Sequence, residues 1–118
     1  MSKTQIPQEQ WASFFNNFNA QNQNKIVKIE ITDDEDYRID YAESLPFKEV
    51  KITSQNDAGI SVSVSAGASN SFLHTIDKTL IVILEEVEEK IKALQIRSAL
   101  GRTAVIRFHP LTKDDDLM

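Results

Sequence analysis

Few side chains in this sequence have chemistry that could serve a binding site near neutral pH. His74 and His109 are its two histidines, and an unperturbed histidine titrates in this range. Tyr37 and Tyr41 add hydroxyl groups that, together with His74, could orient a small ligand among aromatic rings. The candidate ligand-binding residues are therefore Tyr37, Tyr41 and His74, and the sequence offers no candidate catalytic residue.

Each histidine also has a structural interpretation. His74 alternates with Phe72 and Ile76, so the pattern predicts a hydrogen-bonded structural histidine on the same strand face as these two residues. No His-x-x-x-His or similar metal-ligand spacing surrounds it. His109 precedes Pro110 and is expected at the surface. We expect neither a metal ion nor another cofactor.

The densest group of carboxylates is the acidic run from Asp33 to Asp36, with Asp40 close behind it. Several carboxylate oxygens together can bind a hard cation such as Ca²⁺. The run lacks the Asp-x-Asp-x-Asp-Gly pattern with a distal glutamate that a calcium loop requires. We interpret it as a solvated turn between two strands.

Three serines alternate with apolar residues in the segment 60–65 and could mark either a nucleophile or a surface. No Gly-x-Ser-x-Gly motif surrounds them, and a chain with three glycines has no glycine-rich phosphate loop. The pattern therefore predicts a small polar strand face that is exposed to solvent, with a flat surface for another protein as the alternative. The serines are Ser61, Ser63 and Ser65.

The composition is typical of one folded domain. We predict that residues 1–110 form this domain and that residues 111–118 form an acidic, disordered tail. Cysteine is absent, which excludes disulfides and thiolate metal sites, and no stretch reads as a secretion signal or a membrane span. We expect a cytoplasmic protein without a membrane partner. The net charge of −5, with scattered basic residues, argues against binding to nucleic acid.

An aromatic stripe defines the one clear helix. Trp11, Phe14, Phe15 and Phe18 follow i, i+3, i+4, i+7 spacing, which places them on one face of a helix that begins near Pro7. The segment after Phe18 is rich in asparagine and glutamine and predicts a helix end between residues 20 and 22. A sheet or a partner must cover the stripe, and we favour the sheet.

The rest of the chain alternates between apolar and polar residues, as strands do. Pro46 is expected to interrupt this pattern, because proline has no N–H for a central ladder. The segment 79–101 fits either a long helix or two strands, since its apolar residues satisfy both periods. Strands are predicted over 25–31, 37–41, 50–53, 60–65, 72–76 and 103–108.

The chain resembles a family of short, uncharacterised bacterial proteins, a domain of unknown function, over residues 6–109. The resemblance implies strands over 79–85 and 91–97 and no known activity. The chain departs from the family at 51–57, where members have a Gly-x-x-Tyr-Asp-x-x-Asp-Asp turn. The shared motifs are Pro-x-x-x-Trp-x-x-Phe-Phe at 7–15, Leu-His-x-Ile at 73–76, Ile-x-Val/Ile-x-Glu at 81–85, and Ala-Leu-x-Ile…Gly-x-x-x-x-Ile-x-Phe at 93–108.

Together these patterns predict an α+β fold in which the N-terminal helix packs on a mostly antiparallel sheet of five to six strands, an order that small open barrels share. The lack of catalytic groups favours a non-catalytic protein-interaction or accessory module, which binds a protein partner or forms a homodimer. A small-ligand-binding domain or enzyme with a pocket between helix and sheet is the alternative. For a binding module we expect contact through the outer sheet face or the sheet edges.

Overall fold

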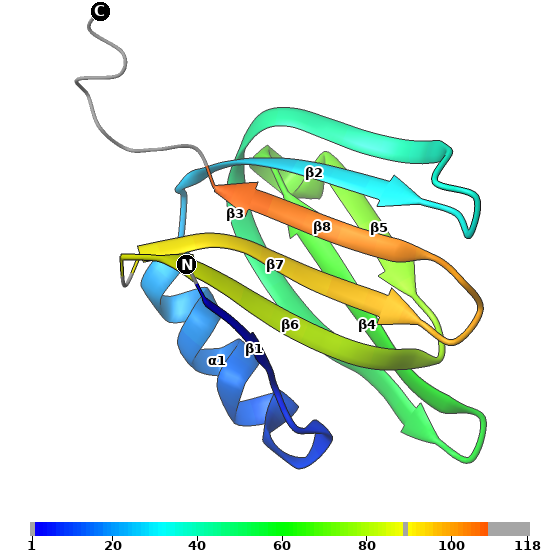
Figure 1. Ribbon diagram of the computed structural model, residues 1–118. Coiled ribbons are helices and arrows are strands. Elements are labelled where there is room, and N and C mark those ends of the chain that lie inside the picture. Colours follow the sequence, from blue (N-terminus) through cyan, green and yellow to red (C-terminus); the bar gives the residue numbers. More distant parts are fainter. Residues whose placement is uncertain (1, 89, 109–118) are drawn as a thin grey trace, which may run out of the picture.

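The computed structural model describes residues 2–88 and 90–108 and confirms the α+β class. Over these residues one α-helix packs on one antiparallel sheet of eight strands, in the order β1-β6-β7-β8-β2-β3-β4-β5 (Figure 1). The sheet is open, with β1 and β5 at its edges. The elements are β1 (Ser2–Gln5), a 3₁₀ turn (Gln8–Gln10), α1 (Trp11–Asn22), β2 (Ile26–Thr32), β3 (Arg38–Asn56), β4 (Gly59–Ala66), a second 3₁₀ turn (Ala68–Asn70), β5 (Phe72–Ile76), β6 (Thr79–Val87), β7 (Lys90–Ser98) and β8 (Thr103–Phe108).

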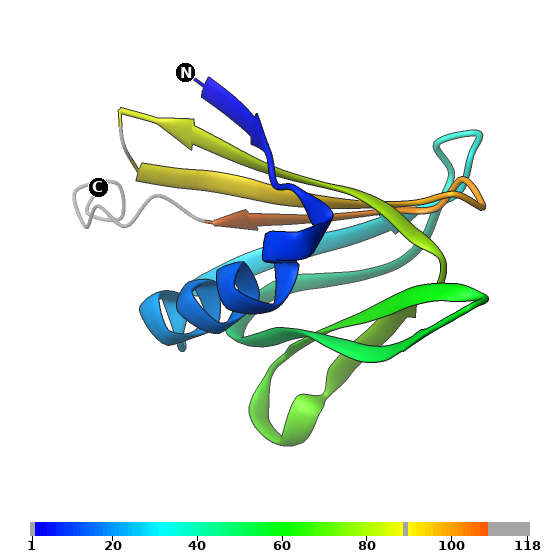
Figure 2. The same ribbon diagram turned by 90° about the horizontal axis from the view of Figure 1, so that it is seen from below.

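The long strand β3 folds the sheet over itself. Its first part pairs with β2 and its second part with β4, so β4 and β5 form a second layer beneath the larger one (Figure 2). Pro46 was expected to interrupt this strand, and that prediction is wrong. Pro46 pairs with Ile26 at the end of β2, and Phe47 already pairs with Ala66 of β4. Proline is tolerated here because β3 changes its partner at this position.

The aromatic stripe closes one side of the space between the layers, as predicted. Trp11, Phe15 and Phe18 keep at most 3% of their surface exposed, and the indole of Trp11 donates a hydrogen bond to the carbonyl of Ile6. The ring of Phe18 packs edge-on against Phe47, with centroids 5.5 Å apart. The α-helix begins at Trp11, after a 3₁₀ turn, rather than at Pro7, and it ends at Asn22 as expected.

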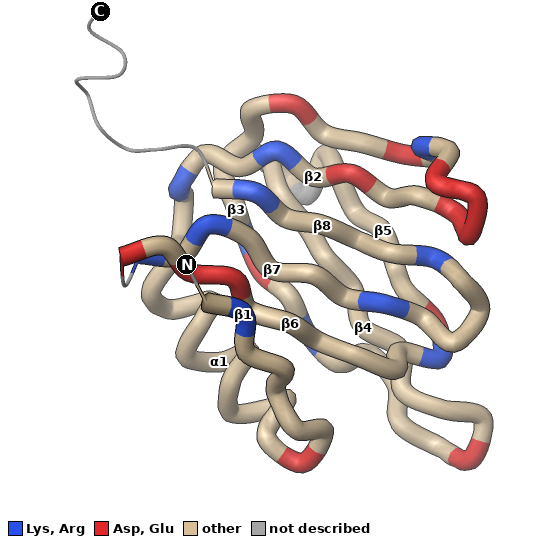
Figure 3. The backbone as a smooth tube through the Cα atoms, viewed as in Figure 1, with Lys and Arg blue, Asp and Glu red and all other residues tan. Residues whose placement is uncertain are grey.

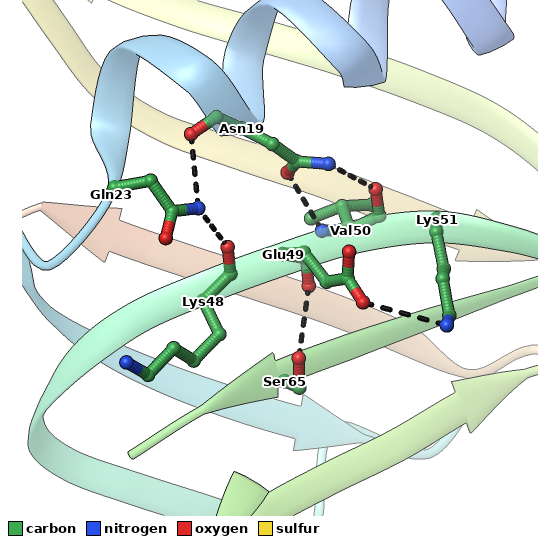
Figure 4. A network of polar contacts seen from close by, with 7 residues as sticks. All are labelled: Asn19, Gln23, Lys48, Glu49, Val50, Lys51 and Ser65. Atoms are coloured by element: carbon green, nitrogen blue, oxygen red, sulfur yellow. Dashed lines mark hydrogen bonds and ion pairs between the residues drawn. The ribbon is translucent and has the colours of Figure 1, made fainter. Parts of the chain in front are cut away.

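Amide side chains at the end of α1 form hydrogen bonds with backbone groups on the free edge of β3 (Figure 4). Beyond Pro46 this edge has lost β2 as a neighbour. The side chain of Asn19 takes its place: its Nδ2 donates to the carbonyl of Val50 at 2.9 Å, and its Oδ1 accepts from the N–H of Val50 at 2.8 Å. Gln23 Nε2 donates to the carbonyl of Lys48. These bonds satisfy backbone groups that would otherwise have no partner within the protein at this edge.

The segment 79–101 forms the two strands β6 and β7, which agrees with the resemblance and excludes the long helix. The sheet has eight strands, more than the five to six expected; β1 was not predicted, and the strands predicted over 37–41 and 50–53 merge into the single strand β3, which begins at Arg38. All four residues of β1 are exposed, so the sequence there shows no alternation. This segment is a strand because it pairs with β6, from Ser2 opposite Glu86 to Gln5 opposite Ile83.

The predicted solvent exposure of the serine face is wrong for Ser63 and Ser65, which are each 3% exposed. Longer side chains on the neighbouring strands cover them. Ser65 lies opposite Glu49 and Leu73, and its hydroxyl donates to the carbonyl of Glu49 (Figure 4). Lys51, opposite Ser63, reaches Glu49 at 3.5 Å and completes this cover. The proposed C-terminal tail at 111–118 and His109 lie outside the described residues.

We expect Phe15→Ala to lower the free energy of unfolding by about 3–5 kcal/mol, because it opens a cavity beneath the helix. Phe14→Ala is the matched control, since Phe14 is the adjacent phenylalanine and is only partly buried. Urea denaturation of both variants measures the difference. Equal losses would contradict the assignment of Phe15 to the core.

We expect Asn19→Ala to destabilise the fold by about 1–3 kcal/mol, because Val50 loses partners for both of its backbone groups. Asn17→Ala, on the exposed side of the same helix, controls for the higher helix propensity of alanine. The comparison again uses urea denaturation. If the two alanine variants were equally stable, the edge contact would contribute nothing.

Candidate interaction surface

The structure separates the three residues predicted to bind a ligand. Tyr37 lies in the β2–β3 turn and is 68% exposed. Tyr41 lies opposite Glu30 on the face of β3 that points away from α1, where the guanidinium of Arg38 stacks on its ring at 4.3 Å. His74 lies on the core side of β5, in line with the buried residues to either side of it. Tyr41 and His74 thus point to different sides of the sheet.

His74 has a partner that the sequence did not suggest. Its Nδ1 lies 3.2 Å from Oδ2 of Asp40, on the core-facing side of β3, which makes it the hydrogen-bonded histidine that was expected. Among the described residues, its Nε2 is buried without a hydrogen-bond partner. Asp40 had been grouped with the acidic run, and no local pattern in the sequence indicates that it faces the core; it does so because it pairs with the buried Ile31 of β2.

A pocket of about 270 Å³ lies elsewhere, where the turns after β3, β5 and β7 meet. Its polar groups bond one another, as Ser61 Oγ donates to Asp77 Oδ1 at 2.9 Å. Lys78 and Leu100 also line it, and no histidine does. The hydroxyl of Ser61 is therefore hydrogen-bonded to a carboxylate and has no histidine beside it in this pocket. Within the described ranges no group of three or more histidine, cysteine, aspartate or glutamate side chains could hold a metal ion.

The side of the layer β1-β6-β7-β8-β2-β3 that points away from α1, which we call the outer face, has no described element above it. The strand register arranges its side chains in three rows that run across the strands. Row 1 is Ile81, Arg97, Thr103, Thr32 and Arg38; row 2 is Gln5, Ile83, Gln95, Val105, Glu30 and Tyr41; row 3 is Lys3, Glu85, Ala93, Arg107 and Lys28.

The rows between these face the core, so the two sides of the layer differ sharply. Leu94 and Ile106, directly beside row 2, are fully buried beneath the helix and the second layer. Ile83 and Val105 in row 2 are half-buried by their neighbours alone. The centre of the outer face is therefore partly apolar without any element covering it.

The outer face is basic although the chain is acidic. Its rows hold five basic and two acidic side chains, and Glu43 adds a third acid where it contacts Lys28 at 4.0 Å, so the formal charge is +2 against −5 for the chain. Lys28 lies directly opposite Arg107 in the register. Like charges in this position repel each other. Acidic residues are grouped at the β2–β3 turn, and a second acidic stretch, Glu85 and Glu86, lies at the end of β6 beside β1 (Figure 3).

A comparison with family models decides the membership of the chain. The model described as "Family of unknown function (DUF5335)" matches residues 2–117. The chain belongs to this family. No curated protein and no solved structure matches it. Membership in this family supplies no activity, so the surface itself has to indicate one.

The described part of this family member contains no helix that is both long and apolar enough to cross a membrane.

The outer face was expected from the sequence only in general terms. The alternation in 103–108 indicated that Val105 and Arg107 share a face, but their neighbours on β2 and β7 follow from strand order, which no local pattern encodes.

We expect His74→Leu to change the free energy of unfolding by less than about 1 kcal/mol. Leucine fills the same space and removes the unpaired Nε2, while Asp40, whose side chain is 43% exposed, remains hydrated. His74→Ala is the matched control, because it leaves a cavity and should cost more. Thermal denaturation tests both. A large loss in the leucine variant would show that the pair with Asp40 stabilises the fold.

Proposed function

We propose that the protein is a non-catalytic interaction module and that its outer face binds a protein partner. The observation that carries this proposal is the uncovered layer of six strands, whose opposite side is closed by α1 and by β4 and β5. A half-buried apolar centre with charged residues around it is the usual anatomy of a protein-binding patch.

A different protein suits this face better than a second copy of the chain. Two copies stacked face to face would bring together two surfaces of charge +2. Such a pairing is unfavourable unless other contacts compensate. Pairing through the sheet edges is limited as well, because β1 has four residues and β5 has five.

A small-ligand site is the second candidate, and the His74–Asp40 pair supports it. A buried nitrogen without a partner, such as His74 Nε2, is a group that a bound ligand could satisfy. Between α1 and the sheet the aromatic rings pack closely, with the ring centroids of Phe18 and Phe108 5.7 Å apart. The alternative therefore rests on the His74–Asp40 pair and not on a pocket beneath the helix. We further propose a bacterial, cytoplasmic setting, which the lack of cysteine suits.

Site-specific crosslinking in the native host tests the interaction module. A photoreactive phenylalanine analogue replaces Gln95, in the middle of row 2, and a matched variant carries it at Gln21, on the exposed side of α1. We expect a discrete protein adduct from position 95 and none from position 21. Val105→Asp, combined with the analogue at position 95, should remove the adduct, because it places a charge beside that position. An adduct that survives this change, or that forms equally at both positions, would contradict the proposal.

A further inference from the structure

We propose that the partner segment bound by the outer face is an acidic amphipathic helix. This inference rests on the proposed function and adds the chemistry of the partner. It is carried by three properties of the three rows: the apolar centre, the basic residues on both sides of it, and the spacing between them.

The middle of row 2 provides the apolar contact. Ile83, Gln95 and Val105 follow one another on β6, β7 and β8, and each is half-buried. All three are uncharged. A partner that covers this centre must present an apolar stripe, because a charged group there would lose its hydration without gaining a counter-charge.

Basic side chains lie on both sides of this centre. Row 1 contributes Arg97 and Arg38, and row 3 contributes Arg107, Lys28 and Lys3. Arg38 contacts Glu30 at 3.3 Å, Lys28 contacts Glu43 at 4.0 Å, and Lys3 lies opposite Glu85. Among the described residues Arg97 and Arg107 have no carboxylate partner, so these two arginines are the groups that an acidic partner would pair with on the two sides of the centre. The partner therefore needs acidic groups along both flanks of its apolar stripe.

The dimensions match a helix that lies along row 2. Rows 1 and 3 are four residues apart on each strand, as Ile81 and Glu85 are on β6, which corresponds to about 13 Å. A helix with its side chains is about 10–12 Å wide. Six strands span about 24 Å, which a helix of about 16 residues covers.

The same face is less suited to a nucleic acid. The ring of Tyr41, the one aromatic side chain in the rows, is already stacked against the guanidinium of Arg38. Single-stranded nucleic acid binds through continuous positive grooves and free stacking rings.

The test uses two designed 16-residue helical peptides. Both carry leucine along one stripe, and the flanking residues are glutamate in the first and lysine in the second. Calorimetry with the full chain should show binding of the glutamate peptide that weakens as salt is raised, and no binding of the lysine peptide. A single-stranded DNA oligonucleotide serves as a third probe.

The variant Arg97→Gln/Arg107→Gln should weaken binding of the glutamate peptide roughly tenfold. Lys48→Gln/Lys51→Gln removes the same charge from β3, beyond the rows, and should leave the affinity unchanged. Equal binding of both peptides, equal effects of both double variants, or tighter binding of the oligonucleotide would overturn the inference. If the analogue at position 95 still gives its adduct in cells while the glutamate peptide does not bind, the proposed function stands and the acidic helix is excluded.

Discussion

A strand that leaves its neighbour needs new partners for its backbone, and this constraint governs the whole structure. When β3 passes Pro46 it parts from β2 and turns into the second layer. The end of α1 and the residues after it then supply the missing partners. Asn19 bonds both backbone groups of Val50, and Lys25 accepts from the N–H of Phe47 at 2.8 Å. Without these bonds the bend in β3 would leave backbone groups of Phe47 and Val50 unpaired at a partly buried edge, which destabilises the fold.

The position of the helix follows from this edge and decides which surface stays free. Because α1 is fixed beside β3, its aromatic stripe reaches the inner rows of the larger layer, where Phe18 meets Phe47 and Phe108. The second layer covers the rest of the inner side. The outer face has no comparable element above it, so the side chains of Ile83 and Val105 are shielded only by those of adjacent strands.

The sequence predicts those features that depend on neighbours along the chain. The aromatic spacing located the helix and its buried face, and alternation located most strands, because both periods are local. The sequence could not reveal β1, whose four residues are exposed and polar. Nor could it reveal the burial of Ser63 and Ser65, because that burial depends on Glu49, Lys51 and Leu73 from other strands. The candidate site was harder still. His74 was correctly interpreted as hydrogen-bonded, but its partner Asp40 and the opposition of Lys28 to Arg107 appear only once the strand order is known.

The place of β2 in the sheet also bears on how the chain reaches this structure. β2 lies between β3, which follows it directly, and β8, which is the last strand in the described part of the chain. The centre of the larger layer therefore cannot be completed during synthesis until β8 has emerged. Until then the edge of β2 that pairs with β8 has unpaired backbone groups, and Ile29 and Ile31 lack their neighbours on β8. Such long-range pairing slows folding and prolongs the exposure of aggregation-prone edges.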